Sequence, residues 1–284
     1  DNPGLITARI SGYGQTGPRS PLPGYASVCE GYGGFRYVNG FADRPPVRPN
    51  LSIGDTLAGL HAAMGVMLAY IQREKDPNSK GQVVDTAIYE SVFNLMEAVV
   101  PEYSGCGAIR EPSGSTITGI APTNTYLTSD KKHVIIGGNG DSIFKRLMIA
   151  IGEPKMAEDS RFEHNEGRVK HEKEIDDAIL EWSSKHTSAE ILSVMDEASV
   201  PAGPIYSVED MMKDEHYIAR GMFQEVEVNG RTLHIPAMIP LLTETPGGTE
   251  WSGPKLSEHT HEVLSELLGK NDQEIKKLAD DGIV

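Results

Sequence analysis

The sequence predicts an α/β protein with a second, smaller α+β domain, and two observations support this. Strand-like runs rich in β-branched residues lie at residues 5–10 and 82–87, and a long helix-compatible stretch almost free of charge lies between them. From residue 123 onward, hairpin signals alternate with amphipathic helical patterns instead. The chain has 284 residues, of which 38% are hydrophobic and 24% charged, so it is long enough for one or two globular domains.

The overall charge and the cysteine content exclude several classes of protein. A formal net charge of −15 argues against nucleic acid as a partner, because no basic stripe is available to meet phosphates. No apolar run reaches the roughly 18 residues of a membrane-spanning helix, so we expect no membrane partner. Cys29 and Cys106 are too few for a disulfide framework and have no metal-ligand spacing. We therefore expect ordinary thiols in the cytoplasm, with mitochondria and peroxisomes as alternatives.

A glycine-rich segment follows the first predicted strand. Gly12, Gly14 and Gly17 have the spacing of a dinucleotide-binding fingerprint. That fingerprint requires a helix to open within the motif, so that the pyrophosphate lies at the helix N-terminus. The prolines within residues 18–23 prevent such a helix, and no acidic residue closes a second strand about 20 residues later. We therefore predict a glycine-rich turn rather than a nicotinamide site.

One acidic residue, Asp55, stands at the start of the long low-charge stretch. Small residues follow it, and we predict a helix over residues 56–71 that lets neighbouring backbones approach closely. One interpretation makes Asp55 the N-cap, whose carboxylate accepts hydrogen bonds from the N–H groups of the first turn. The other makes it a nucleophile or general base held at the positive end of the helix. The two roles are compatible, because a capping carboxylate is also an oriented one.

Three further segments complete the first half of the chain. Residues 24–31 predict a short helix broken by Gly31, and residues 88–100 predict an amphipathic helix. Glycines and prolines punctuate residues 101–122. We expect this segment to be a linker, which acts either as a plain connection or as a mobile lid.

The second half is expected to contain two hairpins and several helices. Residues 125–128 and 133–136 flank a polar turn. Residues 223–228 and 232–235 flank Asn229-Gly230, a strong type I′ turn signal. Helices are predicted, in chain order, at residues 141–151, 167–184, 188–197, 207–214, 258–268 and 271–279.

Several polar residues in this half have both structural and functional interpretations. Asp141 is predicted as the N-cap of its helix. Asn139 could bind substrate or turn the chain, and we favour the turn because asparagine tolerates left-handed geometry. His259 and His261 lack the i, i+4 spacing of a helical metal pair, and no third ligand is evident. We therefore expect no metal site, and a structural role for His259 in packing the C-terminal tail onto the large domain.

Several short segments, in order along the chain, resemble the family III CoA-transferases of the formyl-CoA:oxalate, succinyl-CoA:dicarboxylate and carnitine-CoA type. The segment that resembles their active site is Ile53-Gly54-Asp55, followed by Ala58-Gly59, Ala62-Ala63 and Gly65. The other matching segments are residues 11–18, 45–49, 81–85, 200–205 and 258–264. Each match alone is weak, but together they extend over the whole chain.

The resemblance implies a fold and an assembly. Residues 1–104 would form the C-terminal part of a Rossmann-like large domain, residues 105–122 a linker and residues 123–245 the small α+β domain. Residues 246–284 would return to the large domain as C-terminal helices. The family has a further N-terminal segment, so the chain is expected to be a C-terminal portion, either truncated or completed by a separate polypeptide. Family members form interlocked dimers, so a homodimer, or association with the N-terminal part, is also expected.

The resemblance also implies a reaction and a site. Asp55 would attack an acyl-CoA thioester and form a mixed anhydride, before CoA passes to a carboxylic acid. The partners would be the acyl-CoA and the acid, with the CoA thioester as substrate and no permanently bound cofactor. Pro23, Gly24, Tyr25 and Ala26 would line the CoA site. The alternative for Tyr25 is a core aromatic residue.

A glycine-containing loop closes over the reactive carboxylate in the family, and Gly119, Ile120 and Ala121 are its candidates here. The glycine tetrad of the formyl-CoA type is absent, which argues against an oxalate-type reaction. A 2-methylacyl-CoA racemase of the same fold is an alternative, but such enzymes carry Gly-His-Asp near residues 24–26, where this chain has no histidine. A non-catalytic binding or assembly subunit is a further alternative. The acyl donor and acceptor are left open.

Overall fold

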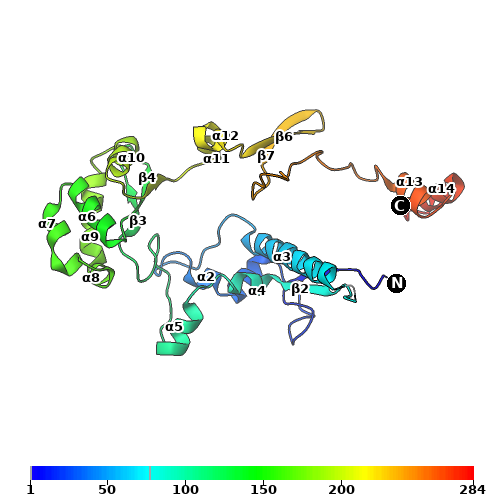
Figure 1. Cartoon of the computed structure of the whole chain (residues 1–284), viewed down its shortest axis with the longest axis horizontal. Coiled ribbons are helices and arrows are strands. Elements are labelled where there is room, and N and C mark those ends of the chain that lie inside the picture. The colour runs from blue at the N-terminus through cyan, green and yellow to red at the C-terminus, as the bar shows by residue number, and fades with distance from the viewer. Residues whose placement is uncertain (1, 77) are drawn as a thin grey trace. The chain divides into compact units, whose positions relative to one another are not determined.

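A computed structural model describes residues 2–76 and 78–284 of the chain (Figure 1). The chain divides into two compact units, one ending at Ile205 and the other beginning at Tyr206. This division falls inside the range 123–245 expected for the small domain, so the domain bounds drawn from the sequence stay a prediction. Both units contain helices and strands.

The first unit begins with a β–α–β arrangement. β1 (Thr7–Ser11) and β2 (Val83–Ala87) pair in parallel over all five residues of each strand. The connection between them contains α1 (Ala26–Tyr32), α2 (Phe35–Val38) and α3 (Ile53–Lys75). Parallel strands require a crossover connection of this kind. The two predicted strands and the α/β class are thus confirmed.

The long helix α3 begins earlier and ends later than the predicted range 56–71. Its buried positions are small residues that share one face of the helix, namely Gly54, Ala58, Ala62 and Ala69. This face contacts β1, β2 and α4 (Ile88–Phe93), whose backbones come close because no large side chain intervenes. Arg73 and Lys75 in the last turn interact favourably with the negative end of the helix, which supports the extension beyond residue 71.

The helix predicted over residues 88–100 is in fact two helices. α4 ends at Phe93, and α5 (Val99–Cys106) begins after a turn in which Glu97 has a φ of 46°. The predicted linker 101–122 therefore starts inside α5. Pro101 is tolerated there, because the first-turn N–H groups of a helix have no intrahelical partner. The amphipathic pattern did not predict this break, because a single irregular turn does not interrupt the spacing of the apolar residues.

The rest of the first unit is built on a three-stranded antiparallel sheet. β3 (Thr123–Leu127) and β4 (His133–Gly137) form the predicted hairpin, and β5 (Ala202–Pro204) pairs with β4. The segments between β4 and β5 are α6 (Asp141–Ala150), α7 (Pro154–Glu158), η1 (Ser160–Phe162), α8 (Asn165–Lys170), α9 (Glu172–Ser183) and α10 (Ser188–Glu197). Apolar side chains of these helices pack with Tyr126, Val134 and Ile136 of the sheet into a buried core.

Two helix predictions in this part are corrected. Gly140 is the N-cap of α6, because the Asp141 carboxylate instead accepts a hydrogen bond from Arg168. α8 and α9, separated at His171, replace the single helix predicted over residues 167–184. The start of α10 at residue 188 was predicted correctly, since the residue before it forms a capping box.

The second unit contains a helix pair, a hairpin and a helical C-terminal segment. α11 (Val208–Lys213) and α12 (Glu215–Ala219) precede β6 (Phe223–Val228) and β7 (Arg231–Pro236). The turn between these strands has positive φ at Asn229 and Gly230, 50° and 73°, as a type I′ turn requires, so the predicted hairpin is confirmed. The C-terminal segments are α13 (Thr260–Glu262), η2 (Val263–Leu267) and α14 (Asp272–Asp280).

Candidate active site

Asp55 lies at the third position of α3, within the first turn. Ser52 is the N-cap, and its side chain makes no capping hydrogen bond, so the N-cap interpretation of Asp55 is wrong. The Asp55 side chain is exposed and has no hydrogen bond or ion pair to any other residue that the structure describes. The positive end of a helix favours a nearby carboxylate. Asp55 is therefore a free acid in a favourable field.

Glu30 of α1 reaches the same helix start. Its side chain is fully buried, and Oε1 accepts a hydrogen bond of 3.3 Å from the backbone N–H of Gly54. Its other oxygen, Oε2, lies 3.3 Å from Nε of Arg48, in an ion pair that lacks hydrogen-bond geometry. Sequence reasoning missed Glu30. The available signal was a single acid inside the predicted helix 24–31, whose burial the sequence could not show.

Close backbone contacts hold the turn after β1 against the start of α1. A Cβ placed on Gly12 would lie 2.7 Å from Cα of Gly24, and a Cβ on Gly24 would lie 3.0 Å from Cα of Gly12. No helix begins between β1 and Ala26, a stretch that the structure describes in full. The predicted glycine-rich turn is thus confirmed in place of a dinucleotide motif.

The predicted CoA-binding residues 23–26 fall into exposed and buried members. Tyr25 is 83% exposed, so its interpretation as a core aromatic residue is wrong. Pro23 is also exposed and Gly24 is half-buried. Ala26 is buried and packs beside Gly54, where a Cβ on the glycine would lie 3.3 Å from Cβ of Ala26. The structure thus brings Ala26 to the first turn of α3, while contact of these residues with CoA stays a prediction.

Cys29 of α1 is a buried thiol that interacts electrostatically with Asp55 and Glu30. Burial, first, and the Asp55 charge, second, raise the pKa of the Cys29 thiol above its usual value. Its Sγ donates a hydrogen bond of 3.3 Å to the carbonyl oxygen of Gly12. A buried thiol that holds its proton is a poor nucleophile, because the thiolate is the reactive form. The Asp55 carboxylate therefore remains the candidate nucleophile at this helix start.

The predicted loop residues Gly119, Ile120 and Ala121 are attached to α8. The Asn165 side chain accepts a 3.2 Å hydrogen bond from the Ala121 N–H and donates one of 2.8 Å to the Gly119 carbonyl. No hydrogen bond or ion pair joins the three loop residues to Asp55 in the described part of the chain. The structure therefore does not bring this loop together with Asp55, and its role stays a prediction.

Arg168 completes the attachment of this loop. Its side chain is fully buried, and Nε donates a 3.0 Å hydrogen bond to the Ala121 carbonyl. The remaining guanidinium donors bond the Asp141 carboxylate and the backbone carbonyls of Phe162, Glu163 and Asn139. Asn139 thus contributes its carbonyl to a structural network, but its backbone does not have the positive φ of the left-handed turn that the sequence favoured. Sequence reasoning missed both Arg168 and Asn165.

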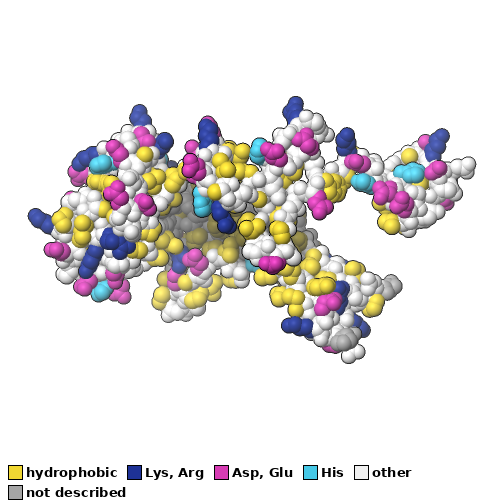
Figure 2. Space-filling view, turned by 45° about the horizontal axis from the view of Figure 1, so that its top comes forward, with side chains coloured by type: hydrophobic (Ala, Val, Ile, Leu, Met, Phe, Trp, Pro, Cys, Tyr) yellow, Lys and Arg dark blue, Asp and Glu magenta, His cyan; other side chains and the backbone are white. Residues whose placement is uncertain are grey.

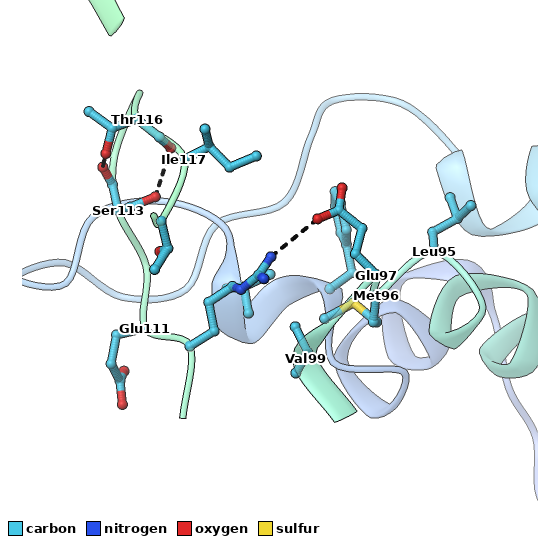
Figure 3. Close-up of a pocket in the computed structure, with 12 residues that line it drawn as sticks. Leu95, Met96, Glu97, Val99, Glu111, Ser113, Thr116 and Ile117 are labelled. Carbon is cyan, nitrogen blue, oxygen red and sulfur yellow. Dashed lines mark hydrogen bonds and ion pairs between the residues drawn. The ribbon is translucent and has the colours of Figure 1, made fainter. Parts of the chain in front are cut away.

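A separate pocket of about 220 Å³ lies between α2, the turn before α5 and residues 110–118 (Figure 3). Its polar centre is Arg110, which pairs with Glu97 at 3.2 Å and with Glu102. Figure 3 shows Leu95, Met96 and Val99 on one side and Ser113, Thr116 and Ile117 on the other. Asp55 does not line this pocket. The charge of Arg110 is already matched by carboxylates, so this pocket offers no free cation for an anionic substrate.

The remaining polar features are compatible with surface roles. On the face shown in Figure 2, acidic and basic side chains are interspersed with apolar ones. His259 contacts Glu262 and His261 contacts Asp272, each at 3.0 Å, and the Glu262 carboxylate raises the pKa of His259. Residues 2–76 and 78–284 contain no group of three or more acidic, histidine or cysteine side chains that could hold a metal ion. No helix in those ranges is both long and apolar enough to cross a membrane.

Together, the fold and the site define an α/β chain that presents a free carboxylate at the start of a long helix. The chain belongs to CoA-transferase family III, whose model matches residues 1–260. The family resemblance noted in the sequence is confirmed, and with it the assignment as a CoA-transferase.

Curated relatives and a solved structure agree with this assignment. The chain is 43% identical over 278 residues to a succinyl-CoA–D-citramalate CoA-transferase of Chloroflexus aurantiacus, covering 98% of this chain and 69% of the relative. It is 30% identical over 267 residues to a succinate–glutarate CoA-transferase of Agrobacterium fabrum, covering 94% and 66%. A CaiB/BaiF family protein from Brucella suis matches with a TM-score of 0.77 and 29% identity, over 94% of this chain and 68% of that one. The chain thus spans about two thirds of the length of these proteins.

Proposed function

We propose that this chain transfers CoA from an acyl-CoA thioester to a carboxylic acid through a mixed anhydride on Asp55. The observation that carries the proposal is the free carboxylate of Asp55 on the first turn of α3, in a chain of this family. A carboxylate that spends no lone pair on capping its own helix is available to attack a carbonyl carbon. The partial positive charge at the N-terminal end of α3 stabilises the ionised form of this carboxylate.

The steps of the reaction balance with Asp55 as the only protein nucleophile. A carboxylate oxygen attacks the thioester carbonyl, the C–S bond breaks and CoA leaves as the thiolate, giving an acyl-aspartyl anhydride. The thiolate attacks the aspartyl carbonyl, which releases the first acid and leaves an aspartyl-CoA thioester. The acceptor carboxylate displaces CoA from this thioester and forms a second anhydride. Attack of the thiolate on the acceptor acyl carbon then yields the new acyl-CoA and regenerates Asp55.

The surroundings of Asp55 are suited to these intermediates. The N–H groups of a helix's first turn lack intrahelical acceptors, and we propose those of Ile53 and Asp55 as donors for an oxyanion. Pro23, Gly24 and the exposed Tyr25 stand next to Ala26, which packs on this turn, so we assign residues 23–26 to the CoA side of the site. Closure of Gly119–Ala121 over the anhydride would keep water out.

The proposed substrates are a short dicarboxylyl-CoA and a dicarboxylic acid. The support is the 43% identity to a transferase named for succinyl-CoA and D-citramalate, together with the 30% identity to one named for succinate and glutarate. We further propose that the active assembly is a homodimer or a complex with a further N-terminal segment. The absence of the formyl-CoA type glycine tetrad leads us to expect oxalate to be a poor acceptor.

The experiment that tests the reaction is trapping at Asp55 in the protein as it occurs in the cell. We would incubate it with succinyl-CoA and other acyl-CoAs, add hydroxylamine, and analyse the peptide containing Asp55 by mass spectrometry. A hydroxamate on Asp55 is expected, together with loss of CoA transfer by at least about a thousandfold in Asp55→Asn, because a nucleophile has been removed. Glu74→Gln, an exposed acid at the far end of α3, is the matched control and should retain activity.

Two other outcomes would point to the alternative functions. Exchange of the substrate α-proton in deuterated water, without a hydroxamate, would favour the racemase. If no thioester gives either a hydroxamate or α-proton exchange, the chain is better explained as a non-catalytic binding or assembly subunit. A hydroxamate on another residue would reject Asp55 as the nucleophile while keeping the transferase.

A further inference from the structure

We infer that Glu30 is a positioning residue for this reaction, because it caps the first turn of α3 from α1 and thereby leaves the Asp55 carboxylate free. The inference rests on the proposed function for its catalytic consequence. The capping hydrogen bond can be tested separately, without any measurement of activity.

The first step is that α3 lacks the cap that helices ordinarily have. An N-cap side chain accepts a hydrogen bond from the second or third N–H of its helix. Ser52 does not do so, while Glu30 Oε1 accepts from the N–H of Gly54, the second residue of α3. Glu30 therefore performs the N-cap function from a different helix.

The second step is what this arrangement does for Asp55. Asp55 stands on the same first turn, where an acidic side chain can itself bond a free N–H group. Because Glu30 already engages the Gly54 N–H, this donor of the first turn is no longer available to the Asp55 carboxylate. The consequence is a carboxylate whose oxygens are not bound to its own helix.

The buried Glu30 carboxylate has a counter-charge, which lowers the free-energy cost of burying it near Asp55. Glu30 is fully buried, and Arg48 Nε lies 3.3 Å from its Oε2. Charges of both Glu30 and Asp55 act on the same thiol, that of Cys29, so the two carboxylates share one neighbourhood. Arg48 supplies the opposite charge that such a buried acid requires. The buried Glu30 carboxylate is thus paired with an arginine whose side chain reaches it from the surface and is 38% exposed.

The test compares variants that keep or remove the capping oxygen. Glu30→Gln keeps an oxygen that can accept from Gly54, whereas Glu30→Ala removes it and Glu30→Asp withdraws it by one methylene. Ser183→Ala is the control, since it also removes a fully buried hydrogen-bonding side chain, one that donates to the Leu127 carbonyl, far along the chain from Asp55. Three readouts apply: hydrogen exchange of residues 52–58, the single-turnover rate of adduct formation at Asp55, and kcat separated from KM.

We expect Glu30→Ala and Glu30→Asp to speed amide exchange in residues 52–58 and to lower kcat by about tenfold or more, with KM nearly unchanged, because Asp55 is misplaced rather than removed. Glu30→Gln should retain the exchange protection of residues 52–58 and most of the wild-type kcat, in contrast to Glu30→Ala. Ser183→Ala should lower thermal stability without changing kcat. If Glu30→Ala does not fold, Glu30→Asp provides the same comparison.

The outcomes separate this inference from the proposed function. Unchanged exchange of residues 52–58 in Glu30→Ala and Glu30→Asp would overturn the capping role, whatever the chemistry. Faster exchange with an unaltered rate of adduct formation would overturn the positioning role alone. Failure of the wild-type protein to form any adduct would reject the proposed function and the catalytic part of this inference, while the exchange data would still decide the cap.

Discussion

Gly54 shows how closely the residue before Asp55 is packed. A Cβ at this position would lie 3.0 Å from Cγ2 of Ile88 and 3.3 Å from Cβ of Ala26. We predict that Gly54→Ala destabilises the protein by about 1–3 kcal/mol, because overpacking outweighs the better helix propensity of alanine. Since the clash moves the first turn of α3, kcat should fall as well. Urea unfolding and steady-state kinetics measure the two effects.

Gly59 is the matched control on the same helix. A Cβ there meets nothing within 4 Å, and the residue is exposed. Gly59→Ala should therefore stabilise the protein by up to about 1 kcal/mol and leave activity unchanged, because only helix propensity changes. Equal effects of the two substitutions would show that the packing around Gly54 is looser than described.

At the scale of single residues, the sequence pointed to the proposed nucleophile but not to the residues that contact its surroundings. Asp55 was recognisable as an isolated acid at the start of a stretch that carries no other charge until Arg73, although its expected capping role was wrong. Glu30, Asn165 and Arg168 act through contacts with residues distant in the sequence, and no local pattern marks such contacts. Tyr25 had two opposite interpretations because an aromatic residue beside glycine fits a core or a surface equally well, and only the fold decided.

Among the elements, the β3–β4 hairpin is fastened to α10 by Asp130. Thr128 Oγ1 donates a 2.5 Å hydrogen bond to this carboxylate, and the Ser188 N–H and hydroxyl each donate one of 3.0 Å. These bonds, that of Thr128 first, lower the pKa of Asp130 to about 2. A carboxylate with a depressed pKa stabilises the folded state above its unfolded pKa, and this contribution is lost as pH falls.

We therefore predict that Asp130→Asn destabilises the protein at neutral pH and that the difference from wild type shrinks as the pH falls from about 4 towards about 2. Urea unfolding across this range measures the difference. A difference that stays constant with pH would show that the hydrogen bonds do not depend on the charge of Asp130.

Two side chains of α8 hold the loop Gly119–Ala121, and Asn165 makes two of the three hydrogen bonds. We predict that Asn165→Ala lowers stability by about 1–2 kcal/mol, because the Ala121 N–H and the Gly119 carbonyl lose their partner. Hydrogen exchange of residues 117–123 should accelerate. Lys170→Ala, on the same helix and exposed, is the control and should leave exchange in the loop unaltered.

Elements were predictable where a local signal existed. The Asn229-Gly230 hairpin was located correctly from its turn residues, and the start of α10 from the amphipathic pattern. The break between α4 and α5 was missed because the turn depends on Glu97, whose left-handed backbone accompanies an ion pair with Arg110. The split between α8 and α9 was missed because helical periodicity continues across it.

For the whole molecule, the exposed side of α3 is the feature that most needs a partner. Large apolar side chains there remain about half exposed or more, namely Leu60, Met64, Met67, Leu68 and Ile71. Such a stripe marks an association surface in soluble proteins. The sequence could not predict this surface, because the small buried residues and the large exposed ones alternate along the same uncharged helix.

We predict that Leu68→Glu weakens the proposed assembly, a homodimer or a complex with an N-terminal segment, because a charge would be buried in an apolar contact. Light scattering after gel filtration measures the mass, and Gln72→Glu, an exposed polar position on the same helix, is the control. An unaltered mass in Leu68→Glu would place the association surface elsewhere.

The contact between Gly12 and Gly24 also limits how this part of the molecule can move. The backbones pack directly against each other here, and no space for a side chain remains between the end of β1 and the segment before α1. A displacement of Tyr25 by an arriving ligand would therefore be transmitted to the end of the strand at once. The two segments are therefore expected to move together as one unit.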